Sequence, residues 1–178
     1  DMQSFRVVGR DKECVAAVRS IYLDKTYERL DKLRTNPLFF PFFSQTIYIN
    51  GEKHRSLDEI LNLLPKSVET LLVHGAENRF SIIHGDLCFT NILVEDTYNF
   101  MRLIDPRGKF GAFDIYGDCY YEYAKMFHTL EGYYDYIIED MFEITVEGAA
   151  ITYKIGSVDA MPWRIFHEVF QDYIKDEH

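Results

Sequence analysis

Three short apolar runs in the middle of the chain constrain its fold most strongly. They lie at positions 80–83, 92–94 and 101–104, and polar segments separate them. Apolar runs of three or four residues between polar turns are typical of short β-strands and too short for amphipathic helices. We therefore expect small β-hairpins in this region, with polar loops at the ends of their strands.

Helical patterns dominate the sequence on the N-terminal side of these runs. The apolar spacing predicts a helix from Asp11, its expected N-cap, to about position 34, and the segment 39–43 is expected to be an apolar connector. Ser56 and Glu59 form a capping-box pattern that predicts a second helix. Pro65 lies inside that helix and is expected to kink it or to split it in two.

The C-terminal part is predicted to contain both kinds of structure. Helical spacing returns at about 118–130 and at 163–175, where Pro162 suits a first turn. The segments 142–146 and 150–155 are expected to pair as a hairpin, with a helix as the alternative for the first of them. The predicted fold class is α+β, mostly α, in one domain that spans residues 1–178.

Composition narrows the classes of partner. The net charge of −10 argues against nucleic acid and against an anionic membrane, since both require clustered Lys and Arg. No apolar run approaches the ~18 residues that span a bilayer. Cys14, Cys88 and Cys119 are far apart and have no CxxC spacing, so we expect free thiols and a cytoplasmic location.

Four polar residues carry the clearest chemical signal. His84, Asp86, Asn91 and Asp105 are spaced as in the catalytic loop and metal-binding segment of kinases. Phosphoryl transfer depends on positioned metal ions and an oriented hydroxyl, so we expect Asp86 to be the catalytic carboxylate. Asn91 and Asp105 offer the oxygen ligands that Mg²⁺ prefers. Taken singly, Asp86 and Asn91 are also common turn and loop residues.

These motifs also carry a family resemblance. His84-Gly-Asp-Leu, Asn91-Ile-Leu and Ile104-Asp-Pro resemble the aminoglycoside phosphotransferase and choline kinase-like family, most closely over positions 82–111. The resemblance implies the C-terminal lobe of a protein-kinase-like fold, with Mg²⁺ and ATP as cofactors. It also implies that Asp118 braces the catalytic loop, for which a plain N-cap is the alternative. His84 is expected, from the motif itself, to be a scaffold residue that binds backbone rather than a general base. A weaker similarity is to a branch linked to bacterial surface-polysaccharide synthesis.

The sequence departs from the kinase pattern in two ways. Asp105-Pro106-Arg107 stands where protein kinases have Asp-Phe-Gly, and Arg107 is expected to contact either phosphate or a carboxylate. No G-x-G-x-x-G loop and no strand with an ATP-clamping lysine is evident. We therefore expect the chain, which begins at Asp1, to be a piece of a longer protein and to need that protein's own N-terminal lobe as a partner.

The expected function is transfer of the γ-phosphate of ATP to a hydroxyl of a small molecule such as a sugar or an amino alcohol. Only positions 106–117 separate Asp105 from the next predicted helix, too few for a peptide-docking segment. The acceptor pocket is expected in the later part of the chain, where core packing is the alternative role for Tyr133, Tyr134, Asp135 and Trp163. A non-catalytic scaffold is the alternative function, and a metal-dependent hydrolase is a third.

Overall fold

The computed structural model describes residues 9–73, 76–95, 97, 100–156 and 161–176, without the side chains at 77, 161–163 and 173–176. The fold is α+β, with more residues in helices than in strands. The helices are α1 (Asp11–Arg19), α2 (Lys25–Arg34), α3 (Phe40–Ser44), α4 (Leu57–Leu72), α5 (Tyr120–Leu130), α6 (Tyr134–Ile138) and α7 (Met161–Asp176). The strands are β1 (Ile47–Ile49), β2 (Glu52–His54), β3 (Phe80–Ile82), β4 (Ile92–Glu95), β5 (Phe100–Leu103), β6 (Tyr116–Asp118), β7 (Phe142–Glu147) and β8 (Ala150–Ile155).

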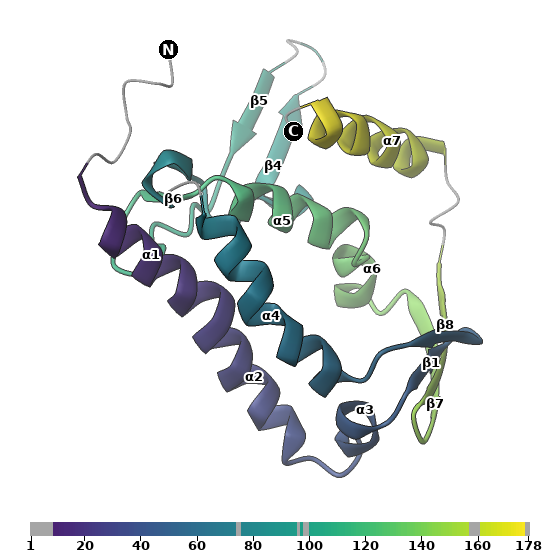
Figure 1. Ribbon diagram of the computed structural model, residues 1–178. Helices are drawn as coiled ribbons and strands as arrows, with labels where there is room; N and C mark the ends of the chain where they lie inside the picture. The colour runs from purple at the N-terminus through teal and green to yellow at the C-terminus, as the bar shows by residue number, and fades with distance from the viewer. Residues whose placement is uncertain (1–8, 74–75, 96, 98–99, 157–160, 177–178) are drawn as a thin grey trace.

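The first predicted helix is present as one long rod made of α1 and α2. A π-helical turn at Ser20–Asp24 joins the two, and the rod runs beside α4 (Figure 1). The predicted cap was wrong by one residue: Arg10 is the N-cap, and its side chain makes no capping hydrogen bond. Asp11 is instead the first helical residue, where its negative charge interacts favourably with the exposed amides of the first turn.

The capping box that was predicted for α4 is formed. The Ser56 hydroxyl accepts from the Glu59 amide at 3.2 Å, and the Glu59 carboxylate accepts from the Ser56 amide at 2.9 Å. The helix continues unbroken through Pro65, so the predicted split does not occur. The reciprocal cap fixes where α4 starts, and burial of Leu61 and Val68 holds one of its faces against the core.

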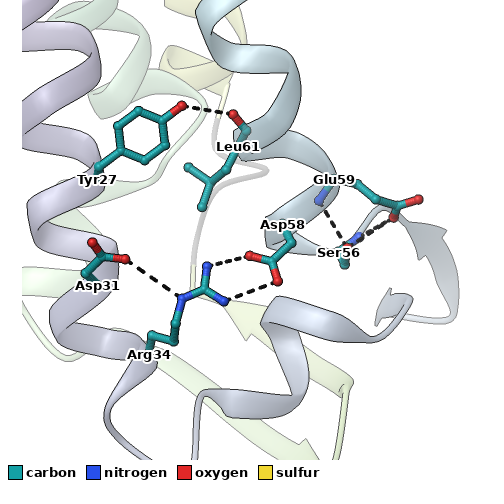
Figure 2. A network of polar contacts seen from close by, with 7 residues as sticks. All are labelled: Tyr27, Asp31, Arg34, Ser56, Asp58, Glu59 and Leu61. Atoms are coloured by element: carbon teal, nitrogen blue, oxygen red, sulfur yellow. Dashed lines mark hydrogen bonds and ion pairs between the residues drawn. The ribbon is translucent and has the colours of Figure 1, made fainter.

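Two polar contacts tie α2 to α4. The Arg34 guanidinium binds both oxygens of Asp58 at 2.5 and 3.2 Å, and the Tyr27 hydroxyl donates to the Leu61 carbonyl at 3.1 Å (Figure 2). The bidentate Arg34 contact fixes the angle between the helices as well as their distance. Together these contacts hold the end of α2 and the start of α4 side by side.

The strands form three separate sheets. β4 pairs with β5 and β7 with β8 as antiparallel hairpins, and both hairpins were predicted. The strand β6 and the hairpin of β1 and β2 were not predicted. β6 pairs with β3, and β1 pairs in parallel with β8 to give a four-stranded sheet in the order β2-β1-β8-β7. The pairings of β3 with β6 and of β1 with β8 join segments that are far apart in the sequence. β1 and β2, in contrast, are joined by a short turn.

The main core lies where α1, α4 and β3 meet. Phe80 of β3 packs edge-on against Phe110, with ring centroids 5.7 Å apart. The other buried residues of this core are mostly small or aromatic: Cys14, Ala17, Val18, Val68, Ala76 and Phe113. The core therefore anchors β3, the strand that leads directly into the loop containing His84 and Asp86.

All three cysteines are free thiols, as predicted. Within the described part of the chain, no helix has the length and apolar character to cross a bilayer.

Candidate functional site

The loop after β3 is held by a carboxylate from α5. Glu122 accepts the amide of Gly85 at 2.7 Å and the amide of His84 at 3.1 Å. Gly85 is buried and has a φ of 77°, and a Cβ there would lie 2.9 Å from the Cβ of Arg107. Only glycine fits this position at low cost, so the sharp turn that presents Asp86 depends on it.

His84 links this loop to the segment after β5. Its Nε2 lies 2.7 Å from the Ile104 carbonyl, which is the backbone hydrogen bond expected of a scaffold residue. Its own carbonyl accepts from the Arg107 amide at 2.8 Å. Two hydrogen bonds from one residue thus hold the segment that contains Asp105 beside the loop that contains Asp86.

Asn91 and Asp105 stand at the same end of the β4–β5 hairpin. The Asn91 carbonyl accepts from the Ile104 amide at 3.0 Å, and the Asn91 side-chain amide donates to the Asp86 carbonyl at 2.8 Å. Asp105 is the residue after Ile104, and its backbone has a φ of 53°. A non-glycine residue in this left-handed region costs free energy, and such residues concentrate at functional sites.

Asp86 is already paired with a cation. Its Oδ1 lies 2.6 Å from the Lys125 ammonium of α5, and both side chains are partly exposed. Burial disfavours the charged form of Lys125, but the hydrogen bond and charge of Asp86 outweigh it and raise the pKa of Lys125. Lys125 therefore stays charged and fixes the direction of the Asp86 carboxylate. No motif in the sequence predicted this contact of Lys125.

The residues present suit a Mg²⁺ ion that is shared with a ligand. Within the described ranges, no group of three or more His, Cys, Asp or Glu side chains lies close enough together to bind a metal ion. Asn91 directs its amide nitrogen to Asp86 and so keeps its amide oxygen as a ligand, and Asp105 is an exposed carboxylate. Mg²⁺ normally takes one or two protein oxygens, with phosphates and water completing its octahedron.

Arg107 and Asp118 have contacts that the sequence did not predict. Arg107 donates to the Tyr121 hydroxyl at 2.5 Å, and within the part of the chain that is described it pairs with no carboxylate. Asp118 is fully buried, binds Arg79 at 2.8 Å and accepts the Tyr120 amide at 3.1 Å. Burial raises the pKa of Asp118, and Arg79 opposes that shift.

The loop is braced by Glu122, and not by Asp118 as the resemblance implied. The two residues are four apart, so on a helical reading of positions 118–130 they share a face. The sequence alone could not decide which of them reaches the loop. The structure shows that β6 ends at Asp118 and buries it, and α5 then carries Glu122 to the amides of His84 and Gly85.

A pocket of about 590 Å³ adjoins the loop between His84 and Asn91. Phe89 and Thr90 form one wall, and the region around α6 forms the rest: Tyr134, Asp135, Tyr136, Ile138, Glu139 and Met141. Both carboxylate oxygens of Asp135 are buried and have no hydrogen-bond partner among the described residues. Of the four side chains expected to form an acceptor pocket, Tyr134 and Asp135 line this one. Tyr133 does not line it, and the Trp163 side chain lies outside the described residues.

Comparisons with known proteins identify no relative. No protein-family model matches the chain, and neither a curated protein nor a solved structure matches it.

Proposed function

We propose that this chain is the catalytic lobe of a Mg²⁺- and ATP-dependent phosphotransferase that acts on a hydroxyl of a small molecule. The observation that carries the proposal is the arrangement of three residues. Asn91 binds the backbone of Asp86, and it pairs through its own backbone with the residue before Asp105. A hydrogen-bonded connection of this kind would hold a candidate base and two candidate metal ligands at one loop cluster.

Each residue has a defined task in the proposed reaction. Asp86 accepts the proton of the acceptor hydroxyl as that oxygen bonds to the γ-phosphorus, with ADP as the leaving group. Asn91 and Asp105 would hold Mg²⁺, which would neutralise charge on the transferred phosphoryl group. Glu122, His84 and Lys125 keep the loop and the Asp86 carboxylate in position.

The pocket beside Phe89 and Thr90 is the proposed acceptor site. Its volume of about 590 Å³ is in the range for a small-molecule ligand. The unpaired Asp135 carboxylate can accept hydrogen bonds from hydroxyl or amino groups, and the Tyr134 and Tyr136 rings offer apolar contact area. The hydroxyl to be phosphorylated would then lie next to the loop that presents Asp86.

Turnover by the full-length protein tests the proposal. We expect ADP release that requires Mg²⁺ and a sugar or amino alcohol, and no phosphorylation of generic peptides. Asp86→Asn should lower kcat at least about 100-fold, as loss of general-base catalysis does, with little change in Tm. Lys12→Met, an exposed change on α1, is the matched control. Near-normal turnover by the Asp86→Asn protein would overturn the assignment, and ligand binding without any turnover would favour a binding module.

A further inference from the structure

A second cavity, separate from the pocket beside Phe89, lies between α2, α4 and α5. Its volume is about 400 Å³, and its walls are largely apolar: Ile21, Tyr22, Leu64, Val68, Leu71, Tyr121 and Ala124. Two cations line it as well, Lys25 and Arg29 of α2. α2 and α4 run side by side in Figure 1, so the cavity lies along the groove that these helices share.

Neither of these cations forms an ion pair within the described part of the chain, and at Lys25 the charge of Glu28 is outweighed by burial and by neighbouring cations. Lys25 is half-buried, and among the described residues neither it nor Arg29 forms a hydrogen bond or an ion pair. The nearby Glu28 carboxylate is taken up by Lys32, at 2.6 Å. A partly buried ammonium group without a counter-ion is unfavourable, and an anionic ligand would remove that cost.

Two further cations extend this positive region to the catalytic loop. Arg107 binds the hydroxyl of Tyr121, a residue that lines the cavity, and Lys125 follows Ala124 on α5. Burial lowers the pKa of Lys25, and so do the positive charges of Arg107, Arg29 and Lys125. Four of the 19 Lys and Arg residues thus gather in one place on a chain of net charge −10. Like charges that repel each other in the free protein are a feature of anion sites.

We propose that this cavity binds an organic phosphate, with Lys25 and Arg29 contacting the phosphate group and the apolar walls contacting its carbon skeleton. Arg107 extends the positive field from the cavity toward the loop of Asp86, whereas the charge of Lys125 is compensated by its ion pair with Asp86. Two molecules could supply this chemistry: the nucleotide itself, or an acceptor that already carries a phosphate. Binding of a phosphate in this cavity does not require the proposed reaction. The role of the cavity as a substrate site does rest on the proposed function.

Calorimetric titration of the full-length protein tests the site without any turnover. The probes are inorganic pyrophosphate, ATP and glucose 1-phosphate, with glucose as the uncharged control. We expect at least one organic phosphate to bind, and Lys25→Met and Arg29→Met each to weaken it about tenfold or more, as loss of a charged hydrogen bond does. Lys12→Met should change Kd less than about twofold, since exposed charges far from a ligand are screened. Binding of ATP alone identifies the nucleotide as the ligand, and binding of glucose 1-phosphate identifies a phosphorylated acceptor.

Two further results separate this proposal from the proposed reaction. Asp86→Asn should keep phosphate binding even though it abolishes turnover, because Asp86 does not line the cavity. Arg29 is exposed, so Arg29→Met should fold normally even where Lys25→Met does not. Failure of every organic phosphate to bind, or unchanged binding in Arg29→Met, would overturn the proposal.

Discussion

The Lys125 ammonium lies 2.6 Å from the Asp86 carboxylate, so a cation from α5 orients the carboxylate that we propose as the base. The side chains are 24% and 42% exposed respectively. An ion pair that is this open to water contributes at most about 1 kcal/mol to stability. The contact therefore matters more for the direction of Asp86 than for folding.

Replacement of Lys125 by Met should accordingly reduce activity without unfolding the protein. We expect kcat to fall about 10- to 100-fold, because small misplacements of a catalytic group have effects of this size. Tm should fall by less than about 4 °C. Lys125→Arg keeps the charge and should restore part of kcat. Unchanged kcat in Lys125→Met would show that Asp86 needs no such support.

Glu122→Gln should loosen the loop that contains Asp86. Glutamine has a single carbonyl oxygen, so it cannot accept from both the His84 and the Gly85 amides with the geometry of a carboxylate. Loss of one acceptor for a buried amide costs about 1–3 kcal/mol, and kcat should fall together with Tm. Glu52→Gln, on the exposed strand β2, is the control. Equal Tm values for the two variants would contradict the bracing role of Glu122.

Local features made most of the elements predictable. The capping box at Ser56 and the apolar runs of β3, β4 and β5 each lie within a few consecutive residues, and each element formed where it was expected. The pairing of β1 with β8 joins residues about a hundred positions apart, and three-residue strands leave too weak a pattern to reveal it. Tertiary contacts, and not local propensity, determine that sheet.

The residues of the candidate site were predictable only where they lie close together in the sequence. Spacing alone identified Asp86, Asn91 and Asp105, because the loop and the hairpin that carry them are continuous in sequence. Glu122 and Lys125 reach the same loop from α5, and nothing local distinguishes them from other charged residues of a helix. Their roles depend on how α5 packs, which the sequence does not encode in any short segment.

The capping box of α4 should make stability depend on acid. Hydrogen bonds from the Ser56 amide and hydroxyl lower the pKa of Glu59 in the folded state. The contribution of Glu59 is therefore complete above about pH 4.5 and is lost as the pH falls through the folded-state pKa. Ser56→Ala should cost about 1 kcal/mol at pH 7. Urea unfolding at pH 7 and pH 3 should show that the difference between Glu59→Gln and the natural protein shrinks at pH 3.

Gly117→Ala should destabilise the core next to the loop that follows β3. A Cβ at this buried position would lie 2.3 Å from the Ile83 Cδ1 and 2.8 Å from the Phe110 Cγ. Overpacking of this kind costs about 1–3 kcal/mol. The control is Gly51→Ala, which meets no atom within 4 Å and adds only the strain of a left-handed φ. Thermal unfolding should give a lower Tm for Gly117→Ala, and the reverse order would contradict the packing around Phe110.

Asp135→Asn should separate stability from function in the proposed acceptor pocket. Within the described ranges both Asp135 oxygens are buried without a partner, and burial raises the pKa of this carboxyl. The folded protein thus binds the Asp135 proton more tightly than the unfolded chain does. The cost of the ionised form is absent below the unfolded pKa of about 3.9, and it grows as the pH rises through the folded-state value.

Removal of that charge should therefore stabilise the protein at neutral pH. We expect Asp135→Asn to raise Tm at pH 7 and to leave it almost unchanged near pH 3, where the natural carboxyl is protonated as well. The same change should raise KM for the acceptor, because an oxygen that could accept two hydrogen bonds is replaced by an amide. Glu139→Gln, an exposed residue of the same pocket, is the matched control and should leave Tm unchanged. A lower Tm for Asp135→Asn at pH 7 would mean that Asp135 stabilises the fold, and that its buried carboxylate is not held for a ligand.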